Sequence, residues 1–90
     1  MSDSFCKTYT FEWMVGARKA RTQFKIDKMI LSSAKFDILA EQINAVAAQS
    51  GWSQGTVRNV REALRETMSL GDDLEVLILP GDDVWYRRVR

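Results

Sequence analysis

The sequence of 90 residues contains no histidine, a single proline and a single cysteine. Without histidine there can be no zinc site of mixed Cys and His ligands and no Ser-His-Asp or Cys-His nucleophile system. Cys6 has no second cysteine to pair with, which excludes an internal disulfide and favours a reducing compartment. A glycine-rich phosphate loop is also missing. We therefore expect no enzymatic activity, no cofactor and no metal.

Two pairs of aspartates, Asp72–Asp73 and Asp82–Asp83, remain as candidates for acid–base or metal chemistry. Each pair follows a glycine at a break between periodic segments, where aspartate is favoured in turns and caps. We interpret both pairs as turn residues.

Long apolar runs are absent as well, since none approaches the roughly 18 residues of a membrane span. The N-terminus lacks the basic start and the apolar core of a signal peptide. Hydrophobic residues make up 46% of the sequence, as in folded globular proteins, and the length suits one domain over residues 1–90. We expect a cytoplasmic protein without a membrane partner.

An excess of charge of one sign is lacking too, because the formal net charge is +1. The chain as a whole is therefore not a generic binder of polyanions. Basic residues are nonetheless unevenly spread, which suits a local anion-binding face, although solvated surface is the commoner explanation. The groups are Arg18, Lys19, Arg21, Lys25 and Lys28, then Arg58, Arg61 and Arg65, then Arg87, Arg88 and Arg90.

Residues 8–15 alternate between two faces with a period of two, which predicts a half-buried strand. The basic segment GARKAR follows, and the alternation returns through Phe24 and Ile26. A β-hairpin with a basic loop is our first interpretation. A helix over residues 11–20 is the alternative, because alanine and arginine are good helix formers.

The apolar period then changes to three and four, which predicts an amphipathic helix over residues 34–50 with Ser32 or Ser33 as its cap. Gly51 ends this helix. Ser53 offers a new N-cap, and a second apolar stripe predicts a helix over residues 53–69.

Two short β-forming segments close the chain, at residues 74–79 and 84–89. Between them Pro80-Gly81 combines the fixed φ of proline with the permissive backbone of glycine, as in a tight turn. These segments therefore predict a C-terminal β-hairpin.

The break between the two predicted helices is short and contains Gly51. We predict that the helices cross steeply there, with the small Ala47 allowing close approach and Gly51 in the left-handed conformation. Trp52 would fill the corner, and Val57 and Val60 would point back into the shared core.

Val46-Ala47, Gly51, Trp52-Ser53, Val57 and Val60 together resemble the helix-turn-helix pattern of DNA-binding regulators. With the PGDD hairpin directly after the second helix, residues 36–89 resemble the winged helix-turn-helix family. Three features depart from that family: Ser50 replaces a usual apolar residue, the wing tip is acidic, and an apparent N-terminal hairpin stands in place of a helix.

The resemblance implies an α+β fold, a winged helix-turn-helix with its helix-turn-helix at about residues 34–69 and a β-hairpin wing at about residues 74–89. An N-terminal strand or hairpin would precede it. Residues 53–69 would be the recognition helix, which lies in the major groove in this family.

The recognition helix carries side chains suited to DNA. Gln54, Arg58 and Asn59 could read base edges, and Arg61 and Arg65 are better placed for phosphates. Ser53 and the first backbone N–H groups of the helix could hold a further phosphate. With two arginines of the second wing strand, the candidate DNA contacts are Ser53, Gln54, Arg58, Asn59, Arg61, Arg65, Arg87 and Arg88.

The function that the resemblance implies is sequence-specific binding of duplex DNA, as a small regulator of transcription or replication. Such regulators commonly act as dimers, and a homodimer of this chain would use the N-terminal strands or a hairpin edge. The alternative is a protein-interaction module or inhibitor of the kind that phages and plasmids encode, which the near-zero net charge and the acidic wing tip favour. The arginine-rich helix face would then be solvated, and the terminal arginines would keep an edge strand soluble.

Overall fold

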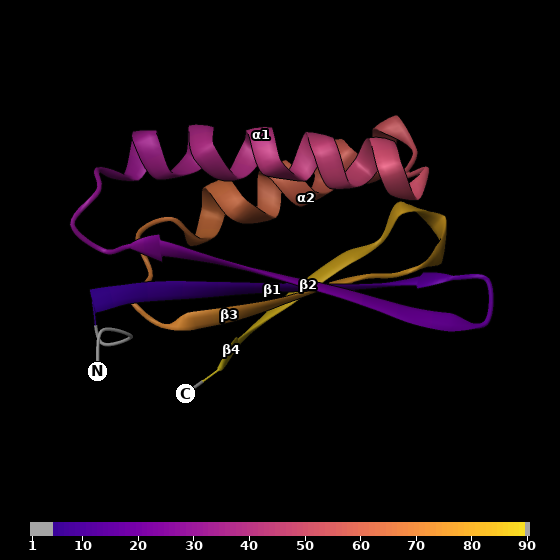
Figure 1. The fold of residues 1–90 in the computed structure, drawn as a ribbon, viewed down its shortest axis with the longest axis horizontal. Helices are drawn as coiled ribbons and strands as arrows, with labels where there is room; N and C mark the ends of the chain where they lie inside the picture. Colours follow the sequence, from indigo (N-terminus) through magenta and orange to yellow (C-terminus); the bar gives the residue numbers. More distant parts are fainter. Residues whose placement is uncertain (1–4, 90) are drawn as a thin grey trace.

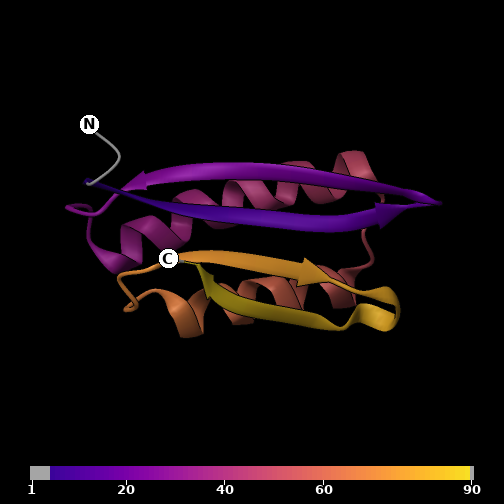
Figure 2. The ribbon, with the colours of Figure 1, turned by 90° about the horizontal axis from the view of Figure 1, so that it is seen from below.

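The computed structural model describes residues 5–89, which form two layers, a four-stranded sheet and a pair of helices over one of its faces (Figures 1 and 2). The elements follow one another as β1 (Cys6–Val15), β2 (Arg18–Asp27), α1 (Ser32–Ser50), α2 (Gln54–Thr67), β3 (Asp73–Ile78), a 3-10 turn η2 (Pro80–Asp82) and β4 (Val84–Val89).

The sheet has the strand order β2-β1-β3-β4. Each hairpin is antiparallel, and the hairpins join through β1 and β3, which lie parallel at the centre of the sheet. The predicted winged helix-turn-helix fold is therefore wrong. In that fold the helices precede the wing hairpin, whereas here two strands come first and the predicted wing supplies a central strand.

The physical reason lies in the long-range pairing of β1 with β3. Tyr9 and Phe11 on β1 stand beside Leu74 and Val76 on β3, and all four side chains are buried. Alternation within each segment predicts one apolar face for each strand, but it carries no information on which strands become neighbours. The two apolar faces are buried most completely when the strands join into one sheet under the helices.

The N-terminal segment is a β-hairpin, as our first interpretation had it, and the alternative helix over residues 11–20 is wrong. The predicted basic loop is also wrong, because the turn is only residues 16–17 and the basic residues 18, 19 and 21 belong to β2. β1 pairs along its whole length with β2, and Gly16 in the turn has a φ of 64°. A helix would have scattered the aromatic residues of β1 over its circumference, whereas the strand turns Tyr9, Phe11 and Trp13 together toward the helices.

The two helices are found close to the predicted boundaries, but their caps and crossing differ in part. Ser53 is the N-cap of α2 as expected, since its side chain accepts a hydrogen bond from the Thr56 N–H. The cap position of α1 is Leu31, with no side-chain hydrogen bond, so the prediction of Ser32 or Ser33 as its cap is wrong.

The predicted steep crossing of the helices is also wrong. Figures 1 and 2 show α1 and α2 side by side and running in opposite directions. Gly51 has a φ of 72°, and the N–H groups of Gly51 and Trp52 both donate to the Ala47 carbonyl. This left-handed helix end reverses the chain at once, so a short connection is enough for an antiparallel pair of helices.

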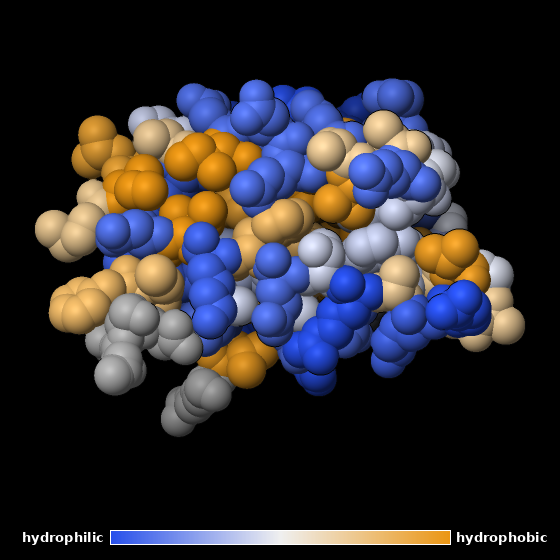
Figure 3. Space-filling model, in the orientation of Figure 1, coloured by the Kyte–Doolittle hydropathy of each residue, from blue (hydrophilic) through white to orange (hydrophobic). Residues whose placement is uncertain are grey.

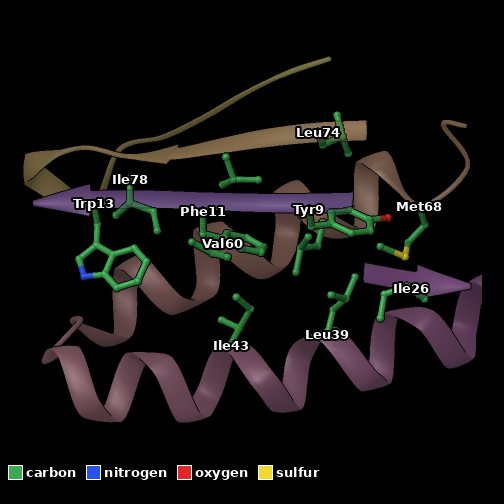
Figure 4. Packing of buried hydrophobic residues seen from close by; sticks show 12 residues of the cluster. Tyr9, Phe11, Trp13, Ile26, Leu39, Ile43, Val60, Met68, Leu74 and Ile78 are labelled. Carbon is green, nitrogen blue, oxygen red and sulfur yellow. The ribbon is translucent and has the colours of Figure 1, made fainter. Parts of the chain in front are cut away.

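The hydrophobic core lies between the sheet and both helices (Figure 4). Leu39 and Ile43 of α1 and Val60 of α2 face the aromatic side chains of β1. Large-to-small changes at such fully buried positions cost about 2–5 kcal/mol. The core residues are Tyr9, Phe11, Trp13, Ile26, Leu39, Ile43, Val60, Leu64, Met68, Leu74, Val76 and Ile78.

Hydrophobic side chains also reach the surface at the end of the molecule where β2 leads into α1 (Figure 3). Met29 and Leu31 in this connection are 83% and 77% exposed, and Ile38 on α1 is 38% exposed. Within residues 5–89, no helix is long and apolar enough to cross a membrane.

Candidate nucleic-acid interface

The outward face of α2 carries three arginines, Arg58, Arg61 and Arg65, which we call the arginine row. α2 buries Val60 and Leu64 against the sheet, and its period of 3.6 residues turns the three arginines to the opposite side. All three are exposed. Together with Gln54 they line a shallow hollow of about 290 Å³, so four of the eight candidate contacts share one surface.

Unlike Lys19 and Arg21 on the sheet, the arginine row has no ion-pair partner among residues 5–89. Lys19 and Arg21 lie 3.8 Å from carboxylate oxygens of Glu12 on the sheet. In the part of the chain that the structure describes, no carboxylate lies within 4.0 Å of the three guanidinium groups of the row. Their charges are thus available to an external anion.

Arg65 is the member of the row that the fold holds most firmly. Its guanidinium carbon lies 4.6 Å from the centroid of the Phe36 ring, a cation–π contact between α2 and α1. Such a contact fixes the long side chain without consuming its five N–H donors. Arg65 is therefore positioned while it remains able to bind an anion.

The N-terminus of α2 is occupied by a carboxylate of the same chain. Asp82 in η2 accepts hydrogen bonds from the hydroxyls of Ser53, at 2.5 Å, and Thr56, at 2.7 Å. The Asn59 side-chain amide donates to the Asp82 carbonyl at 2.7 Å. Asp82 thus stands where a phosphate was expected, at the positive end of the helix dipole.

These contacts change both the charge and the shape of the helix start. The hydroxyls of Ser53 and then Thr56, followed by the charge of Arg58, hold the pKa of Asp82 below its ordinary value. Gly55 leaves space for this carboxylate, because a Cβ at that position would lie 2.5 Å from an Asp82 oxygen. Ser53 and Asn59 are therefore engaged within the chain, and we leave them out of the proposed contact surface.

The two arginines of β4 lie away from the arginine row. The sheet register puts Arg87 on the face that the helices leave open, where its Nε donates to Glu75 at 2.6 Å. Arg88 is on the helix side of the same edge strand, 3.6 Å from Asp72. The structure does not bring these residues together with the row.

Acidic residues border the arginine row on both sides. Glu62 lines the same hollow, and Asp37 of α1 lines the neighbouring one with Arg65. These charges reduce the positive potential of the face, and they would repel a polyanion that reached beyond the three arginines. A ligand must therefore contact the row along a narrow strip.

A buried lysine anchors the other end of α2, and our sequence analysis missed it. Lys7 on β1 is 1% exposed, and its ammonium group donates to the carbonyls of Thr67 at 2.9 Å and Leu70 at 2.6 Å. The same group lies 4.7 Å from the centroid of the Tyr9 ring. The alternation of β1 could have revealed it, because residue 7 shares a face with Tyr9 and Phe11.

No protein-family model, no curated protein and no solved structure is significantly similar to this chain.

Proposed function

We propose that this chain binds duplex DNA through the arginine row of α2, with contacts that go mainly to the phosphate backbone. The single observation that carries the proposal is the row itself, three exposed guanidinium groups on one helix face with no carboxylate within 4.0 Å among residues 5–89. The proposal does not need a winged helix, and a role as a small cytoplasmic regulator of transcription or replication is part of it.

The spacing of the row suits a DNA backbone. Arg58 and Arg65 are seven residues apart, which is about 10 Å along the helix axis. One DNA strand carries a phosphate about every 3.4 Å of its axis, so the row can reach successive phosphates of one strand. α1 lies beside α2 and limits how deeply α2 can enter a groove, which favours phosphate contacts over base contacts.

Gln54 and Arg58 are the side chains available for sequence reading. Both lie near the N-terminal end of the outward face, and their chemistry suits adenine and guanine edges respectively. With only these two groups, we expect weak sequence preference, because phosphate contacts position a protein without specifying a base.

The test is the salt dependence of binding to random-sequence duplex DNA. Three phosphate contacts predict a log–log slope of about −2.7, and Arg61→Ala should bring it about 0.9 closer to zero. Arg21→Ala is the matched control, because Arg21 lies on the opposite face of the sheet and pairs with Glu12. Equal slopes for the parent and Arg61→Ala would contradict the proposed contact surface.

A second candidate function is a protein-interaction module, and the acidic borders of the row favour it. Glu62 and Asp37 would repel a nucleic acid, whereas a protein surface can oppose both the arginines and the carboxylates with groups of complementary charge. The same titration separates the two candidates. If the parent shows no binding to duplex DNA even at low salt, the protein-interaction function replaces DNA binding.

A further inference from the structure

The outer edge of β4 has the features of a self-association surface. β4 and β2 are the two edge strands of the sheet, on opposite sides (Figure 2). An edge strand presents unpaired backbone N–H and C=O groups that can pair with another strand unless the protein blocks the edge. The two edges differ in how they are protected.

The β2 edge is protected by charge. Its exposed side chains include Lys19, Arg21 and Lys25, and a second copy of β2 paired antiparallel along the strand would place Lys25 opposite Lys19 or Arg21, so that like charges meet. The β4 edge instead carries two exposed aromatic side chains, Trp85 on the open face and Tyr86 on the helix side, which are 61% and 42% exposed.

A hollow lined with carboxylates lies beside the β4 edge on the helix side. It measures about 300 Å³, and its lining includes Glu62 and Glu66 of α2, Asp83 and Tyr86. Among residues 5–89, none of the carboxylates of Glu62, Glu66 and Asp83 has a basic group within 4.0 Å. This edge therefore offers aromatic surface and unmatched negative charge together.

We propose that two copies of this chain associate through antiparallel pairing of β4 with β4, so that the two sheets form one continuous sheet with all helices on the same side. A two-fold axis perpendicular to the sheet relates such copies. In an antiparallel pair, two directly opposite residues have their side chains on the same face of the sheet. The two-fold axis must therefore pass midway between the two copies of one residue, and not between two successive residues of a strand.

The length and the side chains of β4 select the register, because an axis at Tyr86 pairs residues 84–88 of each copy within the strand, whereas an axis at Trp85 pairs only residues 84–86. With the axis at Tyr86, the two Tyr86 rings face each other, Trp85 stands opposite Arg87 of the second copy, and Val84 stands opposite its Arg88. Aromatic pairs and arginine–aromatic pairs are favourable across strands. With the axis at Arg87, two guanidinium groups would stand directly opposite each other, which is unfavourable.

With the axis at Tyr86, groups of opposite charge also come together across the interface. Arg88 of each copy is on the helix side and comes next to Val84 of the other copy, at the hollow lined by Glu62, Glu66 and Asp83. Each copy supplies the arginine that the other copy's hollow lacks, and this contact competes only with the exposed ion pair of Arg88 with Asp72 of its own chain, 3.6 Å away. The interface is self-complementary, as a two-fold contact requires. It does not depend on DNA binding, and DNA is absent from its test.

The first experiment is sedimentation velocity of the full chain from about 5 µM to about 500 µM, a range suited to the weak association expected of a small interface. We expect a dimer whose dissociation constant rises at least tenfold in Arg88→Glu. Adding Glu66→Lys to Arg88→Glu should recover most of the affinity. Arg18→Glu makes the same change in charge at the β2 edge and should leave the dissociation constant unchanged.

The second experiment tests the register by disulfide cross-linking in a Cys6→Ser background. Tyr86→Cys should form a cross-linked dimer readily, because opposite Cα atoms in an antiparallel pair are about 4.5–5.5 Å apart, within reach of a disulfide. Arg87→Cys should not, since the two copies of residue 87 would be about 8 Å apart in this register.

Three outcomes would overturn the proposal. The first is a monomer over the whole concentration range. The second is a dimer whose affinity Arg88→Glu does not change, although circular dichroism shows the variant to be folded. The third is cross-linking of Arg87→Cys as fast as that of Tyr86→Cys.

Discussion

Lys7 is a buried ammonium group whose charge the fold disfavours, and we expect it to make the protein more stable as pH rises from 8 to 10. Burial, followed by the positive charge of Lys35, lowers the pKa of Lys7 from 10.5 to about 8. Asp72 and Asp73 act in the opposite direction with smaller effect. The two carbonyls that accept from the ammonium group keep it in place at the end of α2.

The direction of the pH effect follows from proton binding in the two states. Below pH 8 both states hold the proton, so the free-energy cost of the buried charge is fully present. Between pH 8 and 10.5 the unfolded chain holds a proton that the folded chain has released, and the free energy of unfolding rises with pH.

The size of the effect can be bounded. At 1.36 kcal/mol per pH unit, the rise from pH 8 to pH 10 is at most about 2.7 kcal/mol. The contact of Lys7 with Leu70 is only partly buried, and solvent there screens the charge, so we expect about 1–2 kcal/mol. Burial raises the pKa of Tyr9 to about 12, which lowers stability above pH 10 and sets the upper limit of the measurement.

The assay is urea unfolding followed by tryptophan fluorescence at pH 7, 8, 9 and 10. In Lys7→Arg, residue 7 keeps its charge over this whole pH range. The effects of all other titrating groups are common to both proteins, so they cancel when the free energy of unfolding of the variant is subtracted from that of the parent. The free energy of unfolding of the parent should rise by about 1–2 kcal/mol relative to Lys7→Arg between pH 8 and pH 10. Lys7→Met, which is neutral throughout, should track Lys7→Arg in its pH dependence. A parent that tracks both variants would refute the reasoning.

Three further predictions concern stability. Ala47→Leu should lower the free energy of unfolding by about 1–3 kcal/mol, because Ala47 is 6% exposed and added volume overpacks the site; an unchanged melting temperature would contradict this. Tyr9→Phe should raise the free energy of unfolding by about 1 kcal/mol in urea melts, since the Tyr9 hydroxyl is buried without a hydrogen-bond partner within residues 5–89. Figure 4 shows this hydroxyl pointing toward Met68. A clear loss of stability in the variant would show that the hydroxyl has a partner. Asp82→Asn should remove part of the acid sensitivity of the melting temperature. The hydrogen bonds from Ser53 and Thr56 lower the pKa of Asp82 in the folded chain. The stability that these hydrogen bonds give is therefore present above pH 3.8, the ordinary pKa of the carboxyl group, and is lost as the pH falls below that value. The same dependence of melting temperature on pH for both proteins, from pH 2 to pH 6, would rule this out.

The candidate site was predictable where one element decides the placement. The helical period alone turns Arg58, Arg61 and Arg65 to the side opposite Val60, and the structure has them on that side. The engagement of Ser53 and Asn59 was not predictable, because their partner Asp82 lies more than 20 residues away along the chain. A contact of that kind depends on where a distant turn is packed.

The sequence by itself determined the local elements of this protein. Alternation favoured the N-terminal hairpin without excluding a helix, and two β-forming segments around Pro80-Gly81 defined the C-terminal hairpin. The change to a period of 3.6 defined both helices, and Gly51 and Ser53 marked the break between them. Each of these signals acts over a few neighbouring residues. Only the tertiary structure decided that β1 lies beside β3, that the helices run antiparallel over one face, and that Lys7 and Asp82 occupy the two ends of α2. Those outcomes depend on burying the apolar faces of distant segments together, and the local pattern of one segment does not specify the segment that will cover it.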